Sequence, residues 1–350
     1  EKDVATGEPT GLLLGMNLWL GRNVVPPLGL DELKKGVLLA SESFLSQGVT
    51  CVHDASPRNG LDEWRLYKSL VESGYLSIRL RMMIGLDGLA GILSDGLRPH
   101  DTAGSFLKLG PVKLVVEQIG ADLFPSKQVL AAQVRRAHEA GFQVAIHVIT
   151  PKAIRAAIDA TKELGWEDVV RRRHRFEHCT YLPPGLVQQL RQTGATVVGQ
   201  PSFIFFNGAR YLGEVPANKF SWVCRGQSLP RAGVPLVGST DTPVVPNSIM
   251  AAIGAAVTRQ SEVGFVFGRR ERMAVGEAIG MFTEQAARIG FDEHDLGTLQ
   301  PGSLADMVLL AENPADVAPN DIKDISPSVV FIGGKEAWSR ENRSRSAMVP

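Results

Sequence analysis

The sequence lacks the features that mark several common classes of protein. It has three cysteines, Cys51, Cys179 and Cys224, which are far apart and form no CxxC pair. That argues against a disulfide framework or a thiolate zinc site, and it favours a reducing compartment. No apolar run approaches the ~20 residues that a bilayer span needs, and no secretory signal is visible. We therefore expect a cytoplasmic protein with no membrane partner.

Net charge is also absent, because 37 basic residues balance 37 acidic ones. A neutral chain carries no electrostatic footprint for nucleic acid or anionic lipid. The one dense basic run, residues 171–175, is typical of a solvated turn. We expect a small molecule as the substrate and no nucleic-acid partner, and we leave open a homo-oligomer.

What the sequence does contain is a repeating order of helix, glycine and strand. The helical pattern of residues 33–47 stops at Gly48, before an apolar strand. A second helix follows Ser126, a typical N-cap, and stops at Gly141 before the next strand. Glycine ends helices in this way because it adopts positive φ without strain, whereas serine caps their beginnings. The order predicts alternating helices and strands.

The strands are short, apolar and β-branched, as in a parallel sheet that is buried on both faces. Seven are predicted, near residues 49–54, 77–86, 111–117, 143–150, 174–179, 195–201 and 234–240. A closed barrel of this kind needs eight. We predict an α/β fold, a (β/α)8 TIM-type barrel that lacks strand 1. A doubly wound open sheet is the alternative, but no GxGxxG motif follows the first strand.

The ends of the chain differ in composition from the middle. The predicted organisation is a loop-like lead-in segment, a barrel domain, a partial β-sandwich appendage and a polar tail, at residues 1–30, 31–290, 291–337 and 338–350.

Function in such a barrel lies at the carboxyl ends of the strands. His147, His178 and Asp241 end three different strands there. Each has an ordinary alternative, a hydrogen-bonded core histidine or a turn-forming aspartate. Together, their nitrogen and carboxylate groups suit zinc or a similar divalent ion. Lys113 lies within an apolar strand, where an unpaired ammonium is costly, so it needs a partner or a chemical change.

Three further residues are weaker candidates for contact with substrate. His53 ends the first strand and would touch substrate or metal, or else play a structural part beside Asp54. Gln200 ends a later strand and is placed to hydrogen-bond a substrate carbonyl. Arg210 lies in a long loop, where a solvated arginine is the ordinary alternative. Glu177 is expected to point outward to the helices.

Several segments resemble the metal-dependent amidohydrolase superfamily, and most closely its amidohydrolase 3 branch, which includes N-substituted formamide deformylases. The resemblance runs from residue 6 to about residue 337 and rests on Gly-Val-Thr-Cys-Val-His-Asp at 48–54, Val-Ala-Ile-His at 144–147, Arg-Phe-Glu-His at 175–178, Gly-Ser-Thr-Asp-Thr-Pro-Val at 238–244 and Pro-Gly-Ser-Leu-Ala-Asp at 301–306.

The resemblance implies a hydrolase of carbon–nitrogen bonds other than peptide bonds, with one or two divalent metal ions, zinc first among them. His147 and His178 would bind a metal. Asp241 would contact a metal and move a proton between the attacking water and the leaving nitrogen. Lys113 matches the position where relatives often carry a carboxylated lysine that bridges two metals.

The sequence also departs from the family pattern. It contains no His-x-His, the motif that the family carries on strand one, and the strand count independently indicates that strand one is missing. Thr150-Pro151 and Glu117-Gln118 replace the usual Gly-Asp and Asp-Gly. Two alternatives therefore stay open: a catalytically silent fragment or binding protein on this scaffold, and a deaminase or isomerase of the same superfamily.

Overall fold

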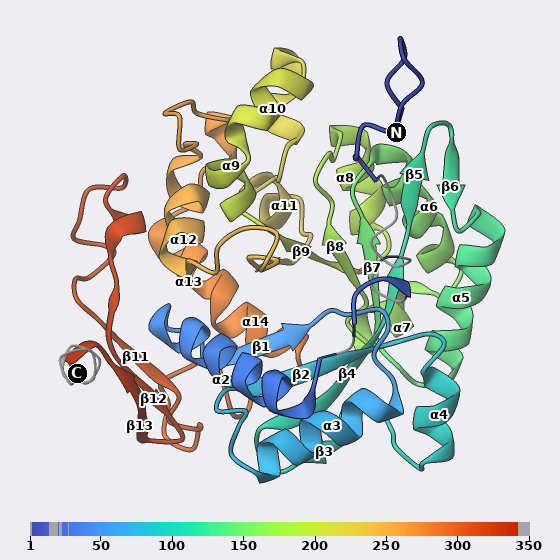
Figure 1. Ribbon diagram of the computed structural model, residues 1–350. Helices are drawn as coiled ribbons and strands as arrows, with labels where there is room; N and C mark the ends of the chain where they lie inside the picture. Colours follow the sequence, from blue (N-terminus) through green and yellow to red (C-terminus); the bar gives the residue numbers. More distant parts are fainter. Residues whose placement is uncertain (1, 14–19, 21–22, 27, 342–350) are drawn as a thin grey trace.

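The computed structural model describes residues 2–13, 20, 23–26 and 28–341. Parts of the predicted lead-in segment and of the predicted tail lie outside these residues. The centre of the molecule is a curled sheet whose strands lie in chain order (Figure 1). They are β1 (Cys51–Asp54), β2 (Arg79–Gly85), β4 (Leu107–Val115), β7 (Val144–Val148), β8 (Arg175–His178), β9 (Thr196–Gly199) and β10 (Leu236–Gly238).

All six pairings along this path are parallel. The seven predicted strands and the parallel sheet are confirmed. A doubly wound sheet requires a point at which the strand order reverses, and this sheet has no such point along the path from β1 to β10. Within the described residues β10 does not pair with β1, so the sheet curls without closing, as in a barrel that lacks one strand. A short strand, β3 (Thr102–Ala103), pairs antiparallel with β4 beside this path.

Helices follow the strands and cover the outside of the sheet (Figure 1). The first seven described helices are α2 (Leu30–Ser46), α3 (Leu61–Glu72), α4 (Leu89–Ser94), α5 (Lys127–Glu139), α6 (Pro151–Lys162), α7 (Trp166–Arg171) and α8 (Pro184–Arg191). Ser126 caps α5 by accepting a hydrogen bond from the Val129 backbone, as the sequence predicted. Gly141 ends the same helix with a φ of 93°, a conformation that favours glycine.

The later part of the chain adds smaller elements. Between β4 and α5 a hairpin is formed by β5 (Glu117–Ile119) and β6 (Asp122–Phe124). After β9 come α9 (Ser202–Phe206), α10 (Gly208–Glu214), η1 (Ala217–Trp222) and α11 (Ser228–Arg231). After β10 come α12 (Ile249–Thr258), η2 (Arg269–Glu271), α13 (Val275–Phe282) and α14 (Glu284–Ile289). No helix in the described ranges is long and apolar enough to cross a membrane.

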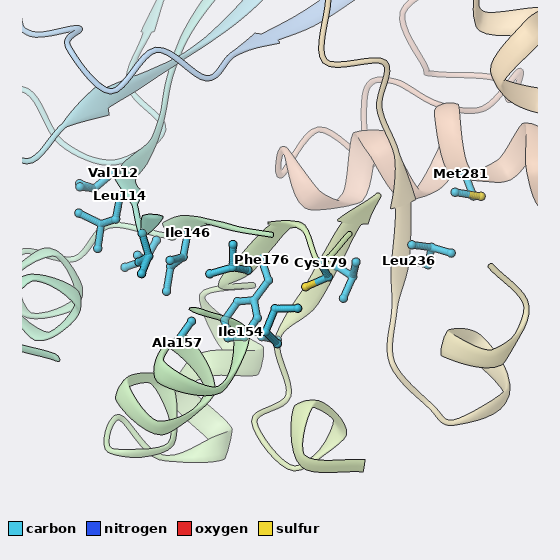
Figure 2. Packing of buried hydrophobic residues seen from close by; sticks show 14 of the residues in the cluster. Val112, Leu114, Ile146, Ile154, Ala157, Phe176, Cys179, Leu236 and Met281 are labelled. Atoms are coloured by element: carbon cyan, nitrogen blue, oxygen red, sulfur yellow. The ribbon is translucent and has the colours of Figure 1, made fainter. Parts of the chain in front are cut away.

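The two faces of the sheet have different compositions because successive residues of a strand point to opposite sides. Val112, Leu114, Ile146 and Phe176 are buried and belong to the same hydrophobic cluster as Ile154 of α6 (Figure 2). Residues one position away from them therefore face the interior of the curled sheet. Much of that interior is polar, and it holds both the floor of the barrel and the candidate site.

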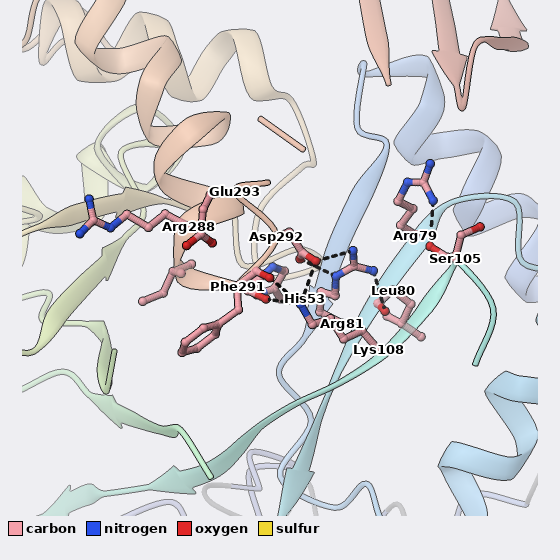
Figure 3. Close-up of polar contacts among 12 residues, drawn as sticks. His53, Arg79, Leu80, Arg81, Ser105, Lys108, Arg288, Phe291, Asp292 and Glu293 are labelled. Atoms are coloured by element: carbon pink, nitrogen blue, oxygen red, sulfur yellow. Dashed lines mark hydrogen bonds and ion pairs between the residues drawn. The ribbon is translucent and has the colours of Figure 1, made fainter. Parts of the chain in front are cut away.

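The floor of the barrel is a network of buried ion pairs near the amino ends of β2 and β4. Arg81 donates to both carboxylate oxygens of Asp292, at 2.7 and 3.0 Å, and Lys108 donates to the same carboxylate at 2.9 Å (Figure 3). Arg79 pairs in the same bidentate way with Asp306, at 2.8 and 2.9 Å. These pairs join the first half of the sheet to the segment that follows α14.

The C-terminal appendage is an antiparallel sheet of β11 (Met307–Leu310), β12 (Pro327–Ile332) and β13 (Lys335–Ser339), with η3 (Ile322–Asp324) before β12. The sequence predicts two of these strands, as short strand-like pieces near residues 304–310 and 329–332, and β11 and β12 lie there. The third was missed, and it reaches Ser339, two residues into the segment predicted as a polar tail. Gly333 and Gly334, with φ of 59° and 76°, turn the chain back so that the polar segment pairs with β12.

Candidate active site

Lys113 faces the interior of the curled sheet from β4. It lies in register with Ala145 and Arg175 on the next two strands, and it is buried. Its ammonium nitrogen has no hydrogen bond or ion pair with any residue that the structure describes. Burial lowers the pKa of Lys113, and the nearby negative charge of Glu177 opposes this shift only in part. The predicted burial is confirmed. Of the two alternatives that the sequence analysis left open, a partner or a chemical change, a hydrogen-bonded or ion-paired partner is not found among those residues.

His147 and His178 meet at the carboxyl ends of β7 and β8. Their ring centroids are 4.4 Å apart, with the planes at 70°. Burial is the main cause that lowers the pKa of His147, to about 3, and the neighbouring His178 and Lys113 add to the shift. Burial also lowers the pKa of His178. Both rings are therefore neutral near neutral pH, and a neutral imidazole offers the lone pair that a metal needs.

Asp241 lies just after β10, the last strand of the sheet, and its side chain approaches His178. Its Oδ2 lies 4.0 Å from Nδ1 of His178. Burial raises the pKa of Asp241, and the neighbouring His178 and Lys113 oppose the shift. A carboxylate with a raised pKa accepts and returns a proton more readily near neutral pH. The three residues from separate strands thus lie together, as the sequence analysis expected, with Lys113 close enough to influence all of them electrostatically.

The backbone at two of these positions is unusual. His178 has a φ of 73° and Asp241 a φ of 59°, in the left-handed region that residues with a side chain seldom adopt. Each such residue costs about 1–3 kcal/mol, and the surrounding structure must hold it in place. Strained backbone of this kind is often found at functional sites, but six other described residues with side chains also have positive φ, so this feature alone does not locate the site.

Gln200 and Phe203 hold the ring of His178. The Oε1 atom of Gln200 lies 2.9 Å from Nδ1 of His178, and its Nε2 donates to the carbonyl of Val198 at 3.1 Å. The Phe203 ring lies nearly parallel to the His178 ring, with centroids 6.5 Å apart. Both ends of the Gln200 amide contact the protein, and its predicted contact with substrate stays a prediction.

Glu177 points inward, so the expectation that it faces the helices is wrong. It lies in register with His147, and it makes a bidentate ion pair with Arg175, at 2.5 and 3.0 Å. Burial by itself would raise the pKa of Glu177, but Arg175 and Lys113 together lower it to about 2. Arg175 is likewise buried, although the basic run that contains it was predicted to be solvated. The apolar Phe176 between them was the available signal, because its neighbours must face the opposite side.

The remaining candidates lie elsewhere. His53 contacts Arg175 through Nδ1, 3.1 Å from Nη1, and burial and Arg175 lower its pKa to about 3. It lies beside the floor of the barrel (Figure 3). Arg210 is exposed on α10, with Glu214 3.7 Å away. No contact in the described structure joins His53 or Arg210 to the group formed by Lys113, His147, His178 and Asp241. The roles of His53 and Arg210 toward substrate stay predictions.

The donor atoms match a divalent metal in type but not in number. Imidazole nitrogen and carboxylate oxygen are ligands that zinc accepts. However, the described residues contain no group of three or more His, Cys, Asp or Glu side chains arranged to hold a metal ion. Two imidazoles and one nearby carboxylate are therefore an incomplete set as they stand.

Comparison with known proteins gives one consistent answer. The model of the Amidohydrolase family matches residues 3–337. The chain is 29% identical over 366 residues to Protein LONG AFTER FAR-RED 3 of Arabidopsis thaliana, covering 95% of this chain and 62% of the relative. It is 23% identical over 369 residues to the N-substituted formamide deformylase of Arthrobacter pascens, covering 97% and 67% of the two chains.

Among solved structures, an uncharacterized metal-dependent hydrolase from Pyrococcus horikoshii OT3 matches with a TM-score of 0.73 at 24% identity. The match covers 86% of this chain and 63% of that one. This likeness shows the fold alone. The chain thus spans about two thirds of the length of the proteins that it matches.

Proposed function

The chain belongs to the amidohydrolase family, and on that basis we propose that it hydrolyses a non-peptide, amide-type carbon–nitrogen bond of a small molecule. The observation that carries the proposal is the meeting of His147, His178, Asp241 and Lys113 at the carboxyl end of one curled sheet. Burial shifts the pKa of each of the four, and shifted groups that converge at strand ends are typical of catalytic sites.

In this proposal the two neutral imidazoles of His147 and His178 would hold a divalent metal, for which zinc is the first candidate. Such an ion, when bound, lowers the pKa of water and polarises a carbonyl group. Asp241 would accept a proton from the attacking water and deliver it to the departing nitrogen. Water is added across the carbon–nitrogen bond, so the products are a carboxylic acid and an amine.

Lys113 would act after a chemical change. Burial favours its neutral amine, and only a neutral amine can attack carbon dioxide to form a carbamate with release of a proton. The carbamate is an anion with two oxygen donors, and it would add ligands to a set that is now incomplete. It would also remove the cost of an unpaired buried ammonium.

A second candidate has an observation of its own in favour. The described residues present no complete set of ligands, and β10 does not pair with β1. A catalytically silent or binding protein on this scaffold would have this appearance. In that case we expect at most one metal ion, bound weakly through His147 and His178.

The test combines metal content with turnover. The protein is purified after growth with zinc, its metal content is measured by elemental analysis, and it is assayed on N-substituted formamides and other small amides. About one metal ion or more per chain, together with amine release, would support the hydrolase. Only traces of any transition metal would contradict it. Weak binding of one ion without turnover would support the silent alternative.

A further inference from the structure

Gln200 makes the one hydrogen bond that reaches the ring of His178 within the described part of the chain. Its Oε1 lies 2.9 Å from Nδ1, whereas Asp241 is farther away, at 4.0 Å. Gln200 is 2% exposed and His178 is 7% exposed. The contact is therefore protected from water, and water cannot easily take the place of either partner.

The orientation of the Gln200 amide is determined by its other end. Nε2 donates to the backbone carbonyl of Val198 at 3.1 Å. If the amide were flipped, Oε1 would face that carbonyl oxygen, and two acceptors would oppose each other without a proton between them. Oε1 must therefore face His178, and an acceptor in that place requires a proton on Nδ1.

We propose that Gln200 is a positioning residue that holds His178 in the tautomer with Nδ1 protonated and Nε2 carrying the free lone pair. The part of this inference that concerns a metal rests on the proposed function. Ligand histidines commonly donate their second ring N–H to an outer partner, which sets the tautomer and the orientation of the ring.

Other side chains limit the position of the ring but not its tautomer. Phe203 lies nearly parallel to one face, and His147 meets the ring in an edge-to-face arrangement. Neither contact distinguishes Nδ1 from Nε2, because both are made with the ring as a whole. The carboxylate of Asp241 also faces Nδ1, but at 4.0 Å it lies beyond hydrogen-bond distance, so the hydrogen bond that selects the tautomer is the one with Gln200.

The direct test is the tautomer of His178 in the metal-free protein. Nitrogen-15 correlation spectra of the imidazole rings distinguish the two neutral forms, and the chain has only seven histidines. The His178 signals are assigned by their loss in His178→Asn. We expect the Nδ1–H form. An Nε2–H form, or an even mixture of the two, would overturn the proposal.

Variants then separate positioning from general stability. Gln200→Leu removes the acceptor and is expected to abolish the tautomer preference and to weaken zinc binding about 10–100-fold. Gln200→Glu keeps an acceptor at the same reach, and in its protonated form its hydroxyl group donates to the Val198 carbonyl as the amide did. This variant should restore both properties at a pH where the buried carboxyl is protonated. Unchanged tautomer and affinity in Gln200→Leu would contradict the proposal, and so would a failure of Gln200→Glu to keep the Nδ1–H form.

Gln143 offers a matched control at the other end of the barrel. It is equally buried, and its Nε2 donates to the carbonyls of Arg173 and Ile289 without touching His178. Gln143→Leu should lower stability and leave the His178 tautomer unchanged. If the wild-type protein binds no metal, the proposed function fails, yet the tautomer measurement still decides the part played by Gln200.

Discussion

Two polar clusters occupy the inside of the same sheet, and they are built in opposite ways. In the floor cluster, defined as Arg81, Lys108 and Asp292, every charge has an opposite charge within 3.0 Å. In the site cluster, defined as Lys113, His147, His178 and Asp241, the contact nearest to an ion pair is 4.0 Å long. Burial is similar for Lys113 and Arg81, at 6% exposure each.

The difference separates stability from function. A buried charge that is fully paired joins distant segments, and removal of one partner leaves the other charge stranded. A buried group without a partner keeps its shifted pKa and its free donor or acceptor, which is what catalysis uses. The following predictions are ordered by the size of the expected effect.

Asp241→Asn should have the largest effect, and on activity alone. Loss of the proton-transfer group is expected to lower kcat/KM by about 10²–10⁴-fold. The melting temperature should stay the same or rise, since the change removes a partly buried carboxylate whose pKa burial raises. Steady-state kinetics and thermal unfolding measure the two quantities. Activity within threefold of the wild type would remove Asp241 from the proposed mechanism.

Asp292→Ala should act on stability instead. The change strands Arg81 and Lys108 in the floor, so the free energy of unfolding should fall by about 3–5 kcal/mol. Urea denaturation measures this loss, and activity per folded molecule should be retained. Asp95→Ala is the control, because Asp95 pairs with Arg65 at 2.7 Å on the surface. There the loss should not exceed about 1 kcal/mol. Equal losses of unfolding free energy in the two variants would contradict the claim that the buried floor cluster stabilises the fold more than a surface ion pair does.

Lys113→Met should raise stability in the metal-free protein. It replaces an unpaired buried cation with an apolar side chain of similar length, and a gain of about 1 kcal/mol or more is expected. Activity should be lost in the same variant. Urea denaturation in the presence of a chelator provides the measurement. A clear loss of stability would mean that Lys113 is paired as the floor cluster is, with Glu177 as the partner.

A histidine outside both clusters gives the smallest effect at neutral pH, because it acts only as the pH falls. His174 accepts a hydrogen bond from the Val144 backbone through Nδ1, and its Nε2 lies 2.9 Å from Nδ1 of His138. Burial is the main cause that lowers the pKa of His174, to about 3, and His138 and Arg172 add to the shift. A histidine in the unfolded chain has a pKa of about 6.5. The unfolded state therefore binds more protons below that value. The contribution of His174 to the free energy of unfolding is therefore complete above about pH 6.5 and is lost as the pH falls toward 3.

His174→Asn removes that titration and can still accept from the Val144 backbone. Its free energy of unfolding should fall less steeply between pH 6.5 and 4, by at most about 1.4 kcal/mol per pH unit relative to the wild type. Urea denaturation at several pH values checks this. Parallel curves for the two proteins would show that His174 is not kept neutral in the folded state.

Much of the fold could be predicted because its signals are local. Glycines at helix ends, Ser126 at a helix start and runs of β-branched residues report the conformation of a few neighbouring residues. Lys113 could be named because an ammonium within an apolar strand is costly, and the other three residues of the site cluster could be named for a related reason. In a parallel barrel every strand end lies at the same face, so their position along each strand was enough.

Contacts between distant residues could not be predicted in this way. Arg81 and Asp292 are 211 positions apart, and nothing near either residue indicates the other. The partner of Gln200 was missed because its side chain is long enough to reach either a substrate or a neighbouring strand. β13 was missed because polar residues pair with β12 only after the chain turns back at Gly333.

The amino-acid sequence by itself thus determined the order of strands and helices, the seven-stranded parallel sheet of a barrel that lacks one strand, and the end of that barrel where chemistry is expected. Tertiary structure alone decided which buried charges are paired and which are left free. The reason is physical. Backbone preferences act over a few residues, whereas the pairing and the pKa of a buried group depend on whatever the folded chain brings within a few ångströms of it.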